Sequence, residues 1–140
     1  MSADDMTLGD VVTDNAVRFP DVTAYRHGDR TITHAQLRAR AVRLVSAMAA
    51  AGVGRQDRIA VLSRNGVEFG ELHAATQLSG IIMATINFRL SRPELEDVLR
   101  RVEPSIVFVA DEFALVMAEL VAPGRRSPPA PVASATAPRV

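Results

Sequence analysis

The sequence predicts an α/β fold in which a partial parallel sheet is flanked by helices and preceded by an N-terminal hairpin. The stretch from Gly52 to Asn87 contains two short apolar runs rich in β-branched residues, joined by a segment of helical length. Two buried strands joined by a helix form the βαβ unit of a parallel sheet. A third apolar run, Ser105–Ala110, follows a further helix and extends this sheet. Because both faces of a parallel sheet are buried, the other segments should supply the helices that cover it.

The N-terminal segment predicts a short amphipathic helix from about Leu8 to Arg18. Thr7 with Asp10 three residues later is typical of a capping box at the start of a helix. Pro20 ends the pattern, because proline cannot continue a helix. One face of this helix is expected to pack inward: Val11, Val12, Asn15, Ala16 and Phe19.

A small hairpin is expected next, at the edge of the fold. Its strands, Val22–Arg26 and Thr31–Thr33, are rich in Val, Thr, Tyr and Ile, which favour extended structure. The Gly28-Asp29 dipeptide between them supplies the backbone freedom that a tight turn needs.

The segment from His34 to Ala51 has the strongest helical pattern in the chain. Thr33 with Gln36 forms a second capping box, and Gly52 follows the last turn as a C-terminal glycine should. Apolar side chains recur at three- and four-residue spacing and predict the buried face: Leu37, Ala41, Leu44, Val45 and Met48.

The central and C-terminal parts predict three strands alternating with three helices. In order, these are strand Arg58–Ser63, helix Val67–Ser79, strand Ile81–Ile86, a helix after Ser91 to about Arg101, strand Ser105–Ala110 and helix Glu112–Leu120. Asn65-Gly66 can cap the first helix, Ser91 with Glu94 forms a capping box for the second, and Asp111 can cap the third.

The composition changes at Val121. Residues 121–140 carry five of the eight prolines, three arginines and no acidic or aromatic residue. Such a segment buries too little surface to offset its ordering entropy, so we expect an ordered body over 1–120 and a disordered Pro/Ala/Arg-rich tail over 121–140. A natural flexible tail and an out-of-frame end are both compatible with this composition, and the abrupt break favours the out-of-frame end.

Composition excludes several function classes. The chain of 140 residues has no cysteine, so thiol nucleophiles, disulfides and Cys-based metal sites are excluded. All 16 basic residues are arginine, so no lysine can act as a catalytic amine. Charges of both signs are mixed along the chain, which argues against nucleic-acid binding. No apolar run reaches the length of a membrane span and no signal peptide is evident, so a cytoplasmic protein is expected.

Few residues are candidates for chemistry. We considered the three histidines and two pairs of helical carboxylates: His27, His34, His73, Glu68 with Glu71, and Glu94 with Asp97. The histidines lack metal-ligand spacing, and the carboxylate pairs fit a solvated helix face better than acid–base catalysis. The segment Gly52–Asp57 begins like a dinucleotide fingerprint, but it lacks the third glycine and follows a helix, so a turn is favoured. Asn65-Gly66 could face a ligand, although a plain helix cap is favoured. We therefore expect no catalytic, cofactor-binding or metal-binding residue.

Three segments together resemble the N-terminal part of AMP-forming acyl-CoA synthetases of the adenylating superfamily, with fatty acyl-CoA ligases the best match: YRHGDRTITHAQL, GVGRQDRIAVLSRN and QLSGIIMATINFRLSRPELEDVL. Two positions depart from the family pattern, with Gln56 where a glycine is common and Ala84 where a proline is frequent. The resemblance covers about Thr7 to Leu120. It implies that residues 1–120 are a partial copy of the superfamily's large N-terminal domain.

The resemblance also implies a reaction. In that family, a carboxylic acid attacks the α-phosphate of ATP to give an acyl-adenylate, and coenzyme A then displaces AMP. The phosphate loop, the aromatic-Gly-x-Thr-Glu segment, the ribose-binding aspartate and the catalytic lysine lie downstream of the matched region, and none of them is in this sequence. ATP, Mg²⁺ and coenzyme A are thus expected for the full-length family, and no cofactor is expected for this chain.

Three hypotheses follow. The chain is an inactive synthetase fragment, one part of a split synthetase, or a non-catalytic binding module that pairs with full-length relatives. The missing lysine and phosphate loop favour the first. The acyl substrate and the oligomeric state do not follow from the sequence.

Overall fold

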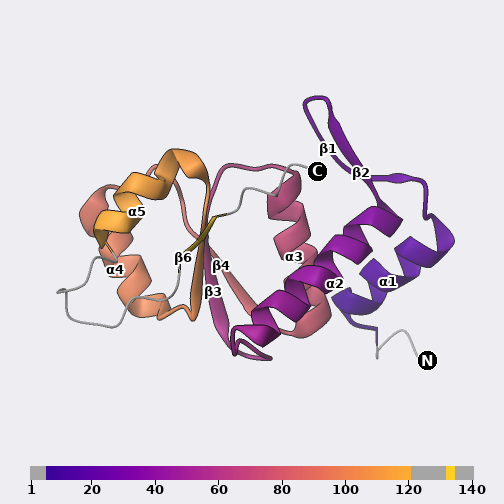
Figure 1. Ribbon diagram of the computed structural model, residues 1–140, viewed down its shortest axis with the longest axis horizontal. Helices are drawn as coiled ribbons and strands as arrows, with labels where there is room; N and C mark the ends of the chain where they lie inside the picture. The colour runs from indigo at the N-terminus through magenta and orange to yellow at the C-terminus, as the bar shows by residue number, and fades with distance from the viewer. Residues whose placement is uncertain (1–5, 121–131, 135–140) are drawn as a thin grey trace. The chain divides into compact units, whose positions relative to one another are not determined.

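The computed structural model describes residues 6–120 and 132–134 (Figure 1). Within these ranges the chain forms two compact units. The first unit contains residues 6–56 and 65–81, and the second contains residues 57–64, 82–120 and 132–134. No helix in the described part is both long enough and apolar enough to cross a bilayer.

The first unit is a group of three helices with a hairpin (Figure 1). Helices α1 (Leu8–Arg18), α2 (His34–Ala50) and α3 (Val67–Ser79) pack against one another. Strands β1 (Thr23–His27) and β2 (Arg30–Thr33) form the antiparallel hairpin, which contacts α2 and α3. All five elements lie within one or two residues of their predicted positions.

Local hydrogen bonds explain where α1 and α2 begin. The Thr7 hydroxyl accepts from the Asp10 amide at 3.2 Å, and the Asp10 carboxylate accepts from the Thr7 amide at 2.8 Å. Thr33 and Gln36 make the same exchange at 3.3 and 3.0 Å. Both predicted capping boxes are therefore confirmed. The predicted inward face of α2 is also confirmed, with Leu37, Ala41 and Met48 buried.

The predicted inward face of α1 is wrong in part. Val11 is 39% exposed and Phe19 is 51% exposed. The helix instead buries Gly9, where an added Cβ would lie 2.8 Å from the carbonyl oxygen of Gln77 in α3. Because the α3 backbone approaches α1 this closely at a glycine, the contact is centred on Gly9 and leaves Val11 and Phe19 at the surface.

The turn between α2 and the first strand of the sheet contains an unusual residue. Gln56 has a φ of 71°, in the left-handed region that favours glycine. Its amide donates to the carbonyl oxygen of Gly80 at 2.9 Å, and Gly80 itself ends α3 with a φ of 73°. The predicted turn over Gly52–Asp57 is confirmed.

The second unit is built on a parallel sheet of four strands in the order β4-β3-β5-β6. These strands are β3 (Arg58–Leu62), β4 (Ile82–Thr85), β5 (Ile106–Val109) and β6 (Val132–Ser134). All three pairings are parallel, as the βαβ pattern predicted. The α/β fold class with a small parallel sheet and flanking helices is thus confirmed.

Helices α4 (Arg92–Val102) and α5 (Ala114–Leu120) pack on one face of this sheet (Figure 1). They enclose a core of alternate strand residues and helix side chains: Ala60, Leu62, Ile86, Leu95, Val107, Val109, Met117 and Leu120. The expectation that Asp111 caps the last helix is wrong, because Asp111 begins a short 3₁₀ turn, η2 (Asp111–Phe113), before α5. Ala110 takes the cap position because the hydrogen-bonded turn starts one residue earlier.

Most of the segment 121–140 lies outside the described residues. Within it, only the backbone of β6 is described, paired with β5. The disordered tail and its reading frame therefore stay predictions.

Candidate functional site

The sheet of the second unit has a topological switch point. Strand β3 comes first in the chain, and its two neighbours, β4 and β5, pair on opposite sides of it. In open α/β sheets, ligands bind beyond the carboxyl ends of the strands, where successive connections diverge. A ligand site is therefore expected at the segments that follow β3, β4 and β5.

Five side chains from these segments come together. The Arg64 Nε donates to both carboxylate oxygens of Glu112 at 3.1 Å. The Arg64 guanidinium lies 4.5 Å from the centroid of the Phe88 ring, and that of Arg89 lies 5.5 Å from it. The Phe88 and Phe113 rings stack with centroids 6.0 Å apart. We call Arg64, Phe88, Arg89, Glu112 and Phe113 the strand-end cluster.

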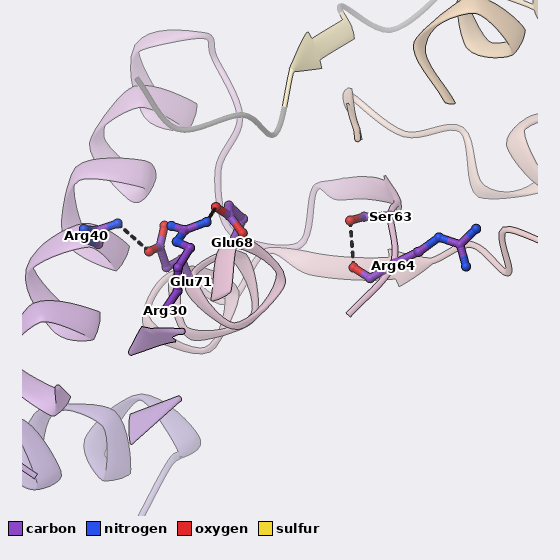
Figure 2. Close-up of polar contacts among 6 residues, drawn as sticks. All are labelled: Arg30, Arg40, Ser63, Arg64, Glu68 and Glu71. Atoms are coloured by element: carbon purple, nitrogen blue, oxygen red, sulfur yellow. Dashed lines mark hydrogen bonds and ion pairs between the residues drawn. The ribbon is translucent and has the colours of Figure 1, made fainter. Parts of the chain in front are cut away.

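The strand-end cluster is suited to binding rather than to covalent chemistry. Two guanidinium groups beside an aromatic face can hold an anion and a flat ring. Ser63 lies next to Arg64, but its hydroxyl donates to the Arg64 carbonyl oxygen at 2.8 Å and is not paired with a base (Figure 2). Among residues 6–120 and 132–134, no group of three His, Asp or Glu side chains could hold a metal ion.

The first unit contains a separate set of ion pairs (Figure 2). Arg40 of α2 donates to Glu71 of α3 at 2.8 Å, and Arg30 of β2 pairs with Glu68. Partial burial raises the pKa of Glu68, but hydrogen bonds from Arg30 and from its own backbone amide outweigh this and hold the pKa below its ordinary value. These pairs link the hairpin and α2 to α3.

The carboxylates that the sequence offered as candidates each have a partner in the structure. The solvated face predicted for Glu68 and Glu71 is wrong for Glu71, whose side chain is only 9% exposed, because Arg40 reaches it from a neighbouring helix. Glu94 caps α4 through Ser91, which lowers its pKa, and Asp97 pairs with Arg100 and Arg101 on the solvated face that was predicted.

The histidines are placed differently from one another. His34 begins α2, where it is half-buried. His27 and His73 lie 46 positions apart in sequence, yet they line the same cavity of the first unit. No spacing rule connects a hairpin residue to a helix residue across this separation, so sequence reasoning missed the cavity. The same limit applies to Arg64 and Glu112, whose pairing depends on the strand order.

A parallel sheet with a switch point is typical of open α/β domains, a class that commonly binds nucleotides. The chain belongs to the AMP-binding enzyme family, whose model matches residues 12–137.

Relatives and solved structures agree with this family. A feruloyl-CoA synthase from Amycolatopsis sp is 37% identical over 103 residues, which cover 74% of this chain and 21% of that protein. A crystal structure described as that of a long-chain-fatty-acid CoA ligase, from Rhodopseudomonas palustris, matches with a TM-score of 0.86 at 35% identity. The match covers 95% of this chain and 33% of that one. The N-terminal domain of FACL13 from Mycobacterium tuberculosis has a TM-score of 0.80 at 28% identity, over 92% of this chain and 33% of that domain.

The resemblance to the N-terminal part of AMP-forming acyl-CoA synthetases is thus confirmed. The chain spans only 21 to 22% of the length of the curated relatives that it matches first.

Proposed function

We propose that this chain forms part of the large N-terminal domain of an ATP-dependent acid–CoA ligase, and that its strand-end cluster contacts a nucleotide-containing substrate. The family match over residues 12–137 carries the first half of the proposal. The position of Arg64, Phe88 and Arg89 beyond the carboxyl ends of the strands supports the second.

The residues of the strand-end cluster fit part of what such a ligase binds. In the full-length enzyme, ATP supplies the adenylyl group and coenzyme A supplies the thiol. Guanidinium groups suit phosphate oxygens, and an aromatic face suits a stacked purine. Arg89 would orient phosphate, as would Arg64 through the guanidinium nitrogens other than the Nε that bonds Glu112. Phe88, whose ring is contacted by both arginines and by Phe113, would exclude water. Ligands for Mg²⁺ are not proposed among the described residues, which contain no suitable cluster.

We propose a carboxylic acid as the second substrate. The proteins named above include a feruloyl-CoA synthase and one described as a long-chain-fatty-acid CoA ligase. Among carboxylic acids we propose a fatty acid first, and with it a role in fatty acid metabolism. A cytoplasmic location is proposed with it, because the reaction consumes ATP and coenzyme A.

We propose that the chain alone does not catalyse the reaction. The family's phosphate loop and catalytic lysine are absent from these residues, and the chain contains no lysine. Purified chain incubated with palmitate or ferulate and MgATP should release no pyrophosphate above the level of a mock purification. A full-length synthetase serves as the positive control. Pyrophosphate release that persists through further purification would refute this proposal.

Nucleotide binding can be tested without catalysis. Coenzyme A or ATP titrated into ¹⁵N-labelled chain should shift the amide signals of Arg64, Phe88 and Arg89. The R64Q variant should weaken binding by roughly three- to tenfold, because one charge-assisted contact is lost. The R43Q variant removes an exposed arginine outside the strand-end cluster and should bind as the unaltered chain does. Equal affinities for R64Q and R43Q would exclude the cluster as the binding site.

The partner of this chain, under the same proposal, is the remainder of a synthetase or a full-length relative. Co-expression with a segment that supplies the phosphate loop and the lysine should then restore acyl-CoA formation. Stable capture of full-length relatives without activity would instead favour the non-catalytic binding module.

A further inference from the structure

The first unit contains a cavity of about 330 Å³ between strand β1 and the first turns of α3. Small-molecule sites in proteins usually have volumes of about 300–1,000 Å³, so this cavity is near the lower end of that range. Strand β1 contributes Tyr25, Arg26 and His27 to its lining, and α3 contributes Phe69, Gly70 and His73. All of them belong to the first unit, whereas the strand-end cluster belongs to the second.

One wall of the cavity depends on a glycine. A Cβ added at Gly70 would lie 2.8 Å from Cε2 and 2.9 Å from Cδ2 of the Tyr25 ring. The absence of a side chain at Gly70 therefore lets the Tyr25 ring lie directly against α3. Tyr25 and Phe69 give the cavity two aromatic side chains.

The polar residues of the lining are Arg26, His27 and His73, together with the neutral Asn65. Arg26 carries a positive charge, and the imidazoles of His27 and His73 can each donate an N–H. No aspartate or glutamate lines the cavity. The two carboxylates of α3 that adjoin lining residues in sequence, Glu68 and Glu71, are paired with Arg30 and Arg40 instead. The Arg26, His27 and His73 side chains are exposed to solvent, and none of them forms an ion pair or a side-chain hydrogen bond with another described residue.

We propose that this cavity binds a small aromatic carboxylate. The ring would lie against Tyr25 and Phe69, and the carboxylate would accept from Arg26 and from the two imidazoles. Aromatic walls with several unpaired donors favour a ligand that is both flat and anionic over one that has only one of these properties. Binding at this cavity is independent of the synthetase reaction, because no residue of the strand-end cluster would contact the ligand.

Three probes separate the two properties. Benzoate has a ring and a carboxylate, benzyl alcohol has the ring without the charge, and inorganic phosphate has charge without a ring. Each is titrated into the full 140-residue chain, which is uniformly labelled so that NMR detects the backbone amides as well as the histidine and tyrosine rings. Benzoate should shift the signals of Tyr25, His27 and His73 with a single dissociation constant of about 1 mM, a reasonable value for so small a ligand. The other two probes should bind at least about fivefold more weakly.

Two variants test the lining. R26Q should weaken benzoate binding by roughly three- to tenfold, since it removes the only full charge of the lining. R43Q, an exposed arginine on α2, should leave the affinity unchanged. G70A should displace the Tyr25 ring and reduce affinity by more than about tenfold. Alanine favours the helix, and far-ultraviolet circular dichroism verifies that G70A is folded.

Clear outcomes would overturn the proposal. They are the absence of saturable benzoate shifts, equal affinity for benzoate and phosphate, or R26Q binding as tightly as R43Q. Benzoate shifts confined to Arg64, Phe88 and Arg89 would also overturn it, because they would assign the ligand to the other unit. Loss of nucleotide binding in R64Q with benzoate binding retained would show that the two sites are independent.

Discussion

Replacing Arg40 by methionine should destabilise the first unit through the carboxylate that it leaves behind. The Glu71 side chain is 9% exposed and accepts from Arg40 at 2.8 Å. A hydrogen bond to a charged group contributes about 1.5–3 kcal/mol, and losing it leaves a nearly buried charge without its partner. The Arg40 side chain is 37% exposed, which screens part of the interaction. We therefore expect R40M to lower the free energy of unfolding by about 2 kcal/mol.

The double variant R40M/E71M separates loss of the ion pair from loss of packing. Methionine at both positions removes both charges and keeps apolar volume, so its stability should lie within about 1 kcal/mol of the unaltered chain. The coupling energy between the two positions should then be about 2 kcal/mol.

Urea unfolding followed by circular dichroism at 222 nm provides the measurement. A loss of 2 kcal/mol should lower the midpoint by roughly 1–2 M. R38M removes an exposed arginine from the same helix and should change stability by less than about 0.5 kcal/mol. If R40M were no more destabilising than R38M, or if the double variant were the least stable of the set, the ion pair would not stabilise the unit as argued.

Three further predictions concern the first unit. Q56G should raise stability by about 0.5–1 kcal/mol in urea unfolding, because a glutamine at φ 71° is strained, and unchanged stability would contradict this. G9A should lower the free energy of unfolding by about 1–3 kcal/mol, because its Cβ meets the α3 backbone. G54A, whose Cβ would have no atom within 4 Å, should leave it nearly unchanged, and similar losses in the two variants would refute the contact at Gly9. The folded-state pKa of Glu68 is lowered, so its contribution is present above the unfolded pKa and disappears as pH falls through the lower folded value. The stability difference between the unaltered chain and E68Q should accordingly shrink from about pH 5 downward, and a difference independent of pH would exclude this linkage.

Elements with short-range signals were predictable from the sequence. Thr33 and Gln36 are three residues apart, and their exchange of hydrogen bonds depends only on the start of one helix. The apolar run of β3 is likewise a property of the segment itself. These signals predicted the α/β fold and nearly all the element positions, because each is decided within about one turn of the chain.

The sites depend on contacts that no local pattern encodes. The spacing of Glu68 and Glu71 shows which helix face they share, but Arg40, which buries Glu71, comes from another element. Arg64 and Glu112 meet only because β3 and β5 are neighbours in the sheet. The sequence did contain one indication of unusual backbone geometry. Gln56 stands where the family pattern commonly has glycine, and the structure gives it a positive φ.

The strand order has a consequence for synthesis on the ribosome. Ile59 of β3 pairs with Met83 of β4 and with Ile106 of β5, so the central strand acquires its second partner only after a long stretch of chain has been made. At about 5–20 residues per second, translation from Ile59 to Ile106 takes roughly 2–10 s. During this interval one hydrogen-bonding edge of an apolar strand is open to other nascent chains or to a chaperone. Yield of the chain in cells should therefore depend on translation rate and chaperone supply as well as on the stability of the finished fold.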